Sequence, residues 1–337
     1  MKLCYACSEN LEINGEMLGY IEGTKFKILE CKSCGASFAD PHTSNQLTYE
    51  YIYKNKDTTP GYSRYFDFSQ KIKHTVSPLK YLASSETMYN GLKILIDDIK
   101  INNISKALDV GCGYGYLTYA LNKYGLQTKG IDISKEAISN AISNYGNYFI
   151  NGDFFKIDNI NDKFDLICML EIIEHVDDPK KYIDKAWSLL NPGGVLYIST
   201  PNKNFYKKKL IWESDIPEVH ISLFTESSIK KMFEGKDYIS LDFINSKFHN
   251  FLHSQIFTSI NRKFSCASTF TANGERLYAT YKKSNVRLIL EKYHLYEIAN
   301  TFRYLFENIY TLIFKNRHFE FTLSRSRTMC IAIKKTK

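Results

Sequence analysis

Four of the eight cysteines form two pairs near the N-terminus, with the spacing of a metal site. Within each pair two residues separate the cysteines, and 23 residues lie between the pairs. Each short loop can present two thiolates to one ion, which suits tetrahedral Zn²⁺. Alternation at Phe26, Ile28 and Glu30 predicts the strands of a zinc ribbon around this site. Because all four ligands are thiolates, we expect a structural zinc on Cys4, Cys7, Cys31 and Cys34.

Glycines and carboxylates follow a series of short apolar segments further along the chain. Gly111, Gly113 and Gly115 stand between the apolar residues 107–110 and a helical pattern. Such a turn lets a ligand approach the backbone closely. Asp132 ends the next apolar segment, where a carboxylate can accept hydrogen bonds from ribose hydroxyls. Together these residues predict a nucleotide-like ligand at the carboxyl ends of parallel strands.

A third group combines carboxylates and imidazoles. Glu171, Glu174 and His175 follow the apolar segment 164–170 at i, i+3 and i+4, which predicts one shared helical face. Two carboxylates and an imidazole suit Mg²⁺ or Mn²⁺ only moderately, and the alternative is an acidic cluster at a helix start. His220 is a candidate general base because imidazole titrates near neutral pH. A structural histidine is the alternative.

Alternating strands and helices must position these groups. Strands are expected at 107–110, 129–131, 148–150, 164–170 and 195–199, with helical patterns between them. This order predicts a parallel sheet with right-handed crossovers. Residues 238–243 and 328–333 are expected to add two more strands, the last one antiparallel. The predicted fold class is therefore α/β and Rossmann-like, with an N-terminal zinc ribbon and a helical insertion before the last strand.

Five motifs carry a resemblance to a known family. In chain order they are LDVGCGYGYLT, GIDIS, NGDFF, FDLICMLEIIEHVDDP and LLNPGGVLYISTPN. Residues 106–202 resemble class I S-adenosylmethionine-dependent methyltransferases. The ribbon, the CKSCGASFADP run and the tyrosine-rich stretch after it resemble bacterial methyltransferases associated with surface glycans. The resemblance covers about residues 1–245 and the final strand.

The resemblance implies roles for individual residues. Asp109 and the three glycines of the turn would face the methionine part of S-adenosylmethionine. Asp132, with Ile133 beside it, would hold the ribose hydroxyls. Asp153 would accept from the adenine amino group, Phe154 would lie beside the ring, and Leu170 and Glu171 would line the floor. The alternatives are a helix-facing acceptor for Asp109 and a core position for Phe154. The EIIEH cluster resembles quinone O-methyltransferases, in which such residues can hold a divalent cation. The predicted catalytic residues are His220, His175 and Glu174.

Composition indicates whether the chain folds and in which compartment it is expected. A hydrophobic content of 44% favours a folded chain over a disordered one. The sequence has no run of about 18 apolar residues, so it predicts no membrane-spanning helix. The N-terminus also lacks the apolar core of a signal peptide. We expect a cytoplasmic protein with reduced cysteines.

The formal charge of +8 is unevenly distributed. Residues 1–202 have 21 basic and 24 acidic side chains, whereas residues 203–337 have 23 and 12. The net charges are therefore −3 and +11. A basic C-terminal part favours an anionic partner, such as a phosphate-bearing substrate or the inner face of a membrane. The alternative explanation for the basic C-terminal part is an AT-rich genome that uses lysine freely, with no anionic partner involved.

These patterns predict five segments. They are a zinc ribbon at 1–40, a linker and helical cap at 41–105, the cofactor-binding core at 106–245, a basic amphipathic helical insertion at 246–325 and the final strand at 326–337. The insertion is expected to cover the substrate, although subunit pairing and lipid contact are alternatives. The sequence does not predict the oligomeric state.

The acceptor is the least determined feature. The first hypothesis is O-methylation of a sugar or glycan precursor, whose phosphates would explain the basic C-terminal part. An RNA acceptor is the second, with ribbon and basic surface binding phosphates. It is disfavoured because Met169-Leu170-Glu171 stands where many base methyltransferases have an Asn/Asp-Pro-Pro-aromatic run. A quinone or lipid-like acceptor is the third. A binding module without activity is the least favoured, since every cofactor motif is intact.

Overall fold

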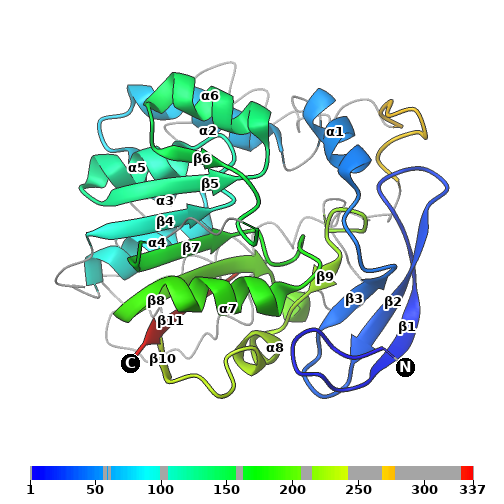
Figure 1. The fold of residues 1–337 in the computed structure, drawn as a ribbon. Coiled ribbons are helices and arrows are strands. Elements are labelled where there is room, and N and C mark those ends of the chain that lie inside the picture. The colour runs from blue at the N-terminus through cyan, green and yellow to red at the C-terminus, as the bar shows by residue number, and fades with distance from the viewer. Residues whose placement is uncertain are drawn as a thin grey trace, which may run out of the picture.

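The computed structural model describes residues 2–55, 59, 62–98, 105–156, 162–205, 215–241, 268–277 and 328–336. Two β-sheets organise this part of the chain (Figure 1). The strands are β1 (Leu11–Leu18), β2 (Lys25–Cys31), β3 (Ser37–Asp40), β4 (Lys106–Val110), β5 (Gln127–Asp132), β6 (Phe149–Asn151), β7 (Phe164–Leu170), β8 (Leu190–Pro201), β9 (Ser222–Leu223), β10 (Tyr238–Leu241) and β11 (Thr328–Lys335). The helices are α1 (Gln46–Lys54), α2 (Ser63–Lys71), α3 (Pro78–Ser85), α4 (Thr87–Asp98), α5 (Tyr116–Tyr124), α6 (Lys135–Tyr145), α7 (Pro179–Leu189) and α8 (Glu226–Lys231), with short 3₁₀ turns at Ile72–His74 and Lys203–Phe205.

The larger sheet has the order β10-β11-β8-β7-β4-β5-β6. The neighbours from β8 to β6 pair in parallel, whereas β11 is antiparallel to both β8 and β10. From β4 the chain proceeds to one side of the sheet through β5 and β6. It then returns to the other side of β4 and continues through β7 and β8, so the strand order reverses at β4. This is the switch point at which open α/β sheets bind ligands. The prediction of a mostly parallel sheet with an antiparallel last strand is confirmed.

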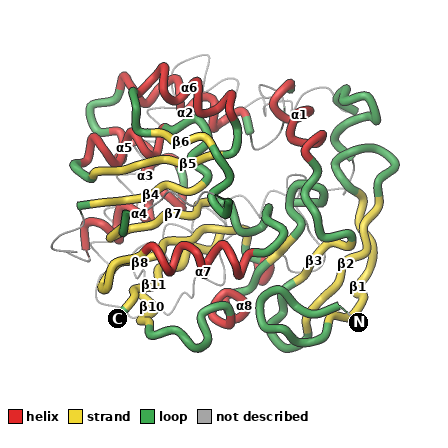
Figure 2. The backbone as a smooth tube through the Cα atoms, in the orientation of Figure 1, coloured by secondary structure: helices red, strands yellow, loops and turns green. Residues whose placement is uncertain are grey.

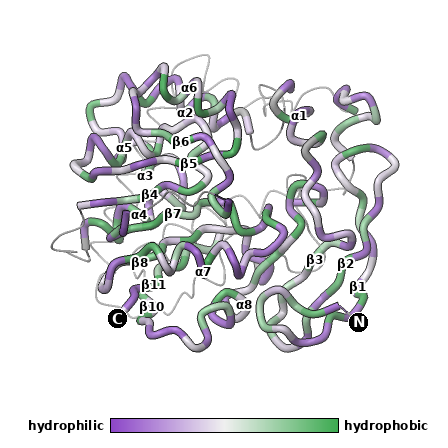
Figure 3. The backbone as a smooth tube through the Cα atoms, viewed as in Figure 1, coloured by the Kyte–Doolittle hydropathy of each residue, from purple (hydrophilic) through white to green (hydrophobic). Residues whose placement is uncertain are grey.

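Helices cover both faces of this sheet because successive strand residues point to opposite sides. Along β8, Leu196 and Ile198 join the core that includes α7 and α8. Val195 and Tyr197 join the opposite core, which includes α3 to α6. Figures 2 and 3 show this layering and the apolar character of the central strands. The sheet is therefore buried on both sides, and its polar groups are left to the strand ends.

The smaller sheet has the order β1-β2-β3-β9, and all its pairs are antiparallel. Its first three strands come from the N-terminal segment. The first two lie between the cysteine pairs, where the alternation predicts strands, and β3 follows the second pair. The fourth strand, β9, comes from the segment that directly follows His220. The N-terminal sheet is thus completed by a strand from a distant part of the chain, and the sequence gives no sign of this.

Two sequence-based expectations differ from the structure. Residues 171–175 form a turn rather than a helix, so the three acidic and imidazole groups do not share a helical face. Glu171 has a φ of 56°, which interrupts helical geometry at the first of these residues. Of the predicted helical insertion, only 268–277 lie among the described residues, and they form a turn bridged to Ile21. The rest of that insertion, and the lysine run at 207–209, lie outside the described residues. The five predicted segment boundaries stay predictions.

Candidate active site and cysteine cluster

The glycine turn joins β4 to α5 at the switch point. Gly111 has a φ of 72°, and a Cβ there would come within 2.0 Å of Ile172 Cδ1. Gly115, at φ 76°, precedes α5, and a Cβ there would meet the Phe149 ring at 2.5 Å. Both positions therefore need glycine for conformation and for space. At Gly113, by contrast, a Cβ would meet nothing within 4 Å, so the turn faces open space at its middle.

Asp132 holds the turn from the neighbouring strand. Its two carboxylate oxygens accept hydrogen bonds from the backbone N–H of Gly113 and of Ser134, each at 2.8 Å. Burial raises the pKa of Asp132, and these backbone donors act against that rise. Ile133 beside it is 72% exposed. Asp132 is thus fixed at the carboxyl end of β5, next to the glycine turn, as expected for a ribose acceptor.

Asp109 and Phe154 point into the protein. The Asp109 carboxylate is 2% exposed and accepts a hydrogen bond of 2.7 Å from Thr118 Oγ1 on α5. Burial raises its pKa to about 7. Phe154 is 4% exposed and packs in the core beside Tyr182. These surroundings match the structural alternatives considered for both residues, and their contacts with a cofactor stay predictions.

Asp153 and Leu170 stand at two further strand ends. One carboxylate oxygen of Asp153 accepts from the backbone N–H of Phe155 at 2.9 Å and from Tyr182 Oη at 3.1 Å. Leu170, the last residue of β7, is half-buried against the core under α3 to α6. Glu171 follows it, and its Oε1 accepts from Ser199 Oγ at 2.9 Å. The predicted cofactor residues therefore surround the carboxyl ends of β4, β5, β6 and β7.

A second polar group forms where the turn after β7 meets the segment before β9. Glu174, His175 and His220 each offer a ligand atom, and these atoms lie within 4.8 Å of one another. The two imidazole rings have centroids 4.6 Å apart. The structure thus brings together all three predicted catalytic residues, from positions 45 residues apart in the chain. Glu171 does not join this group because its carboxylate is held by Ser199.

Neighbouring groups orient the two imidazoles. His175 Nδ1 donates to the Val219 carbonyl at 2.8 Å, which leaves its Nε2 3.7 Å from Glu174 Oε1. Burial, and then His220, lower the pKa of His175 to about 3. Its Nε2 is therefore a lone-pair donor at neutral pH. His220 Nδ1 lies 3.3 Å from Asp215 Oδ1, which places a carboxylate beside this imidazole.

Glu174 is fully buried. Its Oε2 accepts from Thr200 Oγ1 at 2.9 Å, whereas Oε1 has no hydrogen-bond partner among the described residues. Burial, and then the nearby Glu171, raise its pKa well above the usual value. A buried carboxylate oxygen without a partner is costly unless a proton, a cation or a substrate group meets it. The arrangement therefore suits a cation or a hydroxyl of an acceptor.

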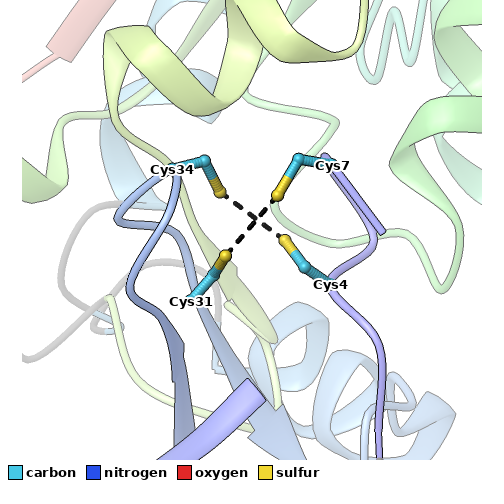
Figure 4. A group of neighbouring side chains, drawn as sticks. All are labelled: Cys4, Cys7, Cys31 and Cys34. Carbon is cyan, nitrogen blue, oxygen red and sulfur yellow. Dashed lines mark hydrogen bonds between the residues drawn. The ribbon is translucent and has the colours of Figure 1, made fainter. Parts of the chain in front are cut away.

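The four N-terminal cysteines converge on one point (Figure 4). Cys4 Sγ lies 3.6 Å from Cys34 Sγ, and Cys7 Sγ lies 3.5 Å from Cys31 Sγ. Four thiolates on a tetrahedral zinc with Zn–S bonds of about 2.3 Å would stand roughly 3.8 Å apart. The separations fit this geometry, and all four sulfurs lie within 4.8 Å of one another.

The cysteine cluster is joined to the histidine group through the segment around β9. Ser37 and Phe38 of β3 pair with Leu223 and Ser222. Thr225 Oγ1 donates to the Cys34 carbonyl at 2.6 Å. These contacts begin two residues after His220. A small hollow lined by Phe38, Asp215, His220 and neighbouring apolar side chains lies between the two parts.

Two residues that contact this group were missed from the sequence. Thr200 lies near the end of β8 in the STPN run, and its place near a strand end could have singled it out. Asp215 faces His220 from within the same segment, but nothing in its sequence surroundings indicates this.

Comparisons with known proteins agree with this geometry. Residues 80–238 match the sequence model of a family described as a methyltransferase domain. Over these residues the chain is similar to methyltransferase domains. A stretch of 156 residues is 35% identical to the mitochondrial ubiquinone biosynthesis O-methyltransferase of Dictyostelium discoideum, covering 39% of this chain and 48% of that protein. The corresponding Coxiella burnetii protein is 38% identical over 103 residues, covering 29% and 44%.

The chain spans about half the length of these curated relatives. Among solved structures, a S-adenosylmethionine-dependent methyltransferase from Clostridium acetobutylicum aligns over 46% of this chain and 82% of that one. The identity is 20% and the TM-score is 0.37. The similarity to methyltransferases is thus found in the family match over residues 80–238 and in the curated relatives. No helix among the described residues is long and apolar enough to cross a membrane.

Proposed function

We propose that this protein is an S-adenosylmethionine-dependent O-methyltransferase whose acceptor is a hydroxyl of a quinone-like molecule. The observation that carries the proposal is the meeting of Glu174, His175 and His220 beside the predicted cofactor residues. The names of the curated relatives favour a quinone-like acceptor over the sugar, glycan and RNA alternatives.

The residues at the strand ends fit the cofactor. The open middle of the glycine turn leaves room for it, and Asp132 offers a carboxylate at the ribose position. When bound, S-adenosylmethionine would supply a methyl group already activated by its sulfonium. What this chain must do is orient the acceptor oxygen and take up its proton. His220 Nε2 would receive that proton, and Asp215 would stabilise the resulting imidazolium at Nδ1.

Binding of S-adenosylhomocysteine tests the cofactor assignment. We expect Asp132→Ala to weaken binding at least tenfold in calorimetry, because the ribose loses its acceptor and the turn loses the bond to Gly113. Asp165→Ala, which removes a carboxylate at the opposite end of the sheet, is the matched control. An unchanged affinity for the Asp132 variant would reject the assignment.

Turnover of His220→Ala tests the predicted base. We expect a loss of at least a hundredfold in kcat while the affinity for S-adenosylhomocysteine changes less than threefold, since the ring lies outside the cofactor turn. His42→Ala is the control, because His42 bonds Ser222 on the other side of the same segment. Near-normal turnover of the His220 variant would remove it as the base.

A divalent cation on Glu174, His175 and His220 is a second candidate arrangement for the same step. It is favoured by Glu174 Oε1, which has no hydrogen-bond partner among the described residues, and by the lone pair on His175 Nε2. A mixed carboxylate and imidazole set suits Mn²⁺ or Mg²⁺ moderately. Turnover after chelation and after re-addition of Mn²⁺ separates the two. A reversible loss supports the cation, and unchanged turnover supports His220 acting alone.

We also propose that the N-terminal cysteines hold a structural zinc. The sulfur separations of 3.5 and 3.6 Å and the cysteine-only donor set support this.

A methyl-transfer screen against quinones, nucleotide sugars, glycan acceptors and RNA identifies the acceptor. Transfer to a sugar alone would overturn the quinone-like assignment while leaving the methyltransferase assignment intact.

A further inference from the structure

Arg64 stands at the start of α2 with part of its guanidinium unused. Its Nε lies 3.1 Å from Glu86 Oε1, and Nη2 donates to Tyr65 Oη at 2.9 Å. No hydrogen bond to a described residue engages Nη1. The side chain is 38% exposed.

The placement of α2 brings this cation to the cofactor side of the sheet. The next residue but one, Phe66, packs edge-on against Tyr114 of the glycine turn, with ring centroids 5.9 Å apart. Tyr145 of α6 donates to the Ser69 carbonyl at 2.8 Å and fixes the other half of the helix (Figure 1). Arg64 is also close enough to Glu171, at the end of β7, for the two charges to interact. Arg64 is therefore carried by a helix that packs against the glycine turn, and its charge is felt at Glu171.

Glu86 keeps the Arg64 guanidinium charged. Burial alone would lower the pKa of Arg64, but the Glu86 carboxylate raises it above the usual value. The charge is thus kept in place by one carboxylate held at the end of α3. Because a guanidinium offers five donors in a planar fork, its free edge can bind a second carboxylate with two parallel hydrogen bonds.

We propose that Arg64 binds the α-carboxylate of the methionine part of S-adenosylmethionine. The cofactor's only carboxylate belongs to that part, which the glycine turn is predicted to hold. The inference rests on the proposed function. It adds a cofactor-binding residue contributed by the helical segment before the sheet, outside the five sequence motifs.

A comparison of two ligands tests the proposal. S-adenosylhomocysteine carries the α-carboxylate, whereas 5′-methylthioadenosine keeps the nucleoside and sulfur but lacks the amino-acid part. We expect Arg64→Ala to weaken S-adenosylhomocysteine at least tenfold in calorimetry and to change methylthioadenosine less than twofold. Arg64→Lys should recover part of the lost affinity because it keeps the charge without the fork. Lys71→Ala, at the exposed end of the same helix, is the control and should change neither affinity.

The outcomes are separable. An equal loss for both ligands would show that Arg64 only supports the fold, and no loss for either would place the carboxylate elsewhere; each result overturns the proposal. If the wild-type protein binds neither ligand, the proposed function itself fails. Should Arg64→Ala not fold, Arg64→Lys and Arg64→Gln are compared with the same ligand pair, and the same ratio of losses decides.

Discussion

Carboxyl groups at neighbouring strand ends of this domain meet different surroundings, which separates what each can do. Asp132 is bonded by two backbone N–H groups and sits beside the glycine turn. Asp109 is buried and accepts a hydrogen bond from the Thr118 hydroxyl. Glu174 is buried with one oxygen partnerless among the described residues. Only environment distinguishes these groups, because their intrinsic acidities are similar.

The burial of Asp109 predicts a pH dependence of stability in the cofactor-free protein. Its folded-state pKa of about 7 lies above the unfolded value, so the native state binds the extra proton. The free energy of unfolding should therefore fall as the pH rises from about 4 to 7. Asp109→Asn keeps an acceptor for Thr118 and removes the titration. We expect urea unfolding at pH 5 and 8 to show about 2 kcal/mol less pH dependence for the variant. An identical dependence in both proteins would contradict this prediction.

At the scale of elements, the segment from His220 to α8 joins the two sheets. β9 completes the N-terminal sheet, and α8 packs on the larger sheet a few residues later. Thr225 lies between them. Its Oγ1 donates to the Cys34 carbonyl at 2.6 Å and accepts from the Ser228 N–H at 3.0 Å, which caps α8. One hydroxyl thus connects the cysteine cluster to the core.

Thr225→Val is expected to lower the free energy of unfolding by about 2 kcal/mol. The change removes a helix cap and leaves the buried Cys34 carbonyl without its donor, each worth about 1 kcal/mol. Thr225→Ser keeps the hydroxyl and should stay within about 0.5 kcal/mol of the wild type. Denaturant unfolding of the three proteins measures the difference. Equal stability of the valine and serine variants would show that the hydroxyl contributes nothing.

At the scale of the whole molecule, the N-terminal sheet is expected to support the histidine group. The sheet contacts the segment that contains His220, whereas the predicted cofactor residues lie on β4 to β7. Damage to the cysteine cluster should therefore affect the two functions unequally.

Cys31→Ser tests this division. We expect about one zinc per wild-type chain by elemental analysis and loss of that zinc in the variant. Turnover should fall because the support of His220 is weakened, while the affinity for S-adenosylhomocysteine should change less than threefold. Cys168→Ala, within β7, is the control that keeps its zinc. A folded wild-type protein free of zinc would reject the metal, and parallel losses of turnover and affinity would reject the division.

Local patterns determined a large part of this protein. Short-range features predicted the convergence of the cysteine pairs, the glycine turn and the strand with Asp132 at its end, because they depend on residue spacing and on turn and strand chemistry alone. The helical face at 171–175 was predicted wrongly. Spacing of i, i+3 and i+4 favours a helix, but Glu171 adopts a positive φ and its carboxylate bonds Ser199 on β8. A contact with a neighbouring strand therefore outweighed the local preference.

Only the tertiary structure decided which polar groups meet. His220 joins Glu174 and His175 because the segment before β9 is anchored to the N-terminal sheet, and Asp215 and Thr200 reach the same place from other elements. Arg64 is brought close to the glycine turn because an aromatic contact and a hydrogen bond fix α2. Local spacing in the sequence specified the order of strands along the chain and the glycine turn. The assembly of the predicted catalytic residues depends on packing between segments far apart in the chain, and no local pattern encodes that packing.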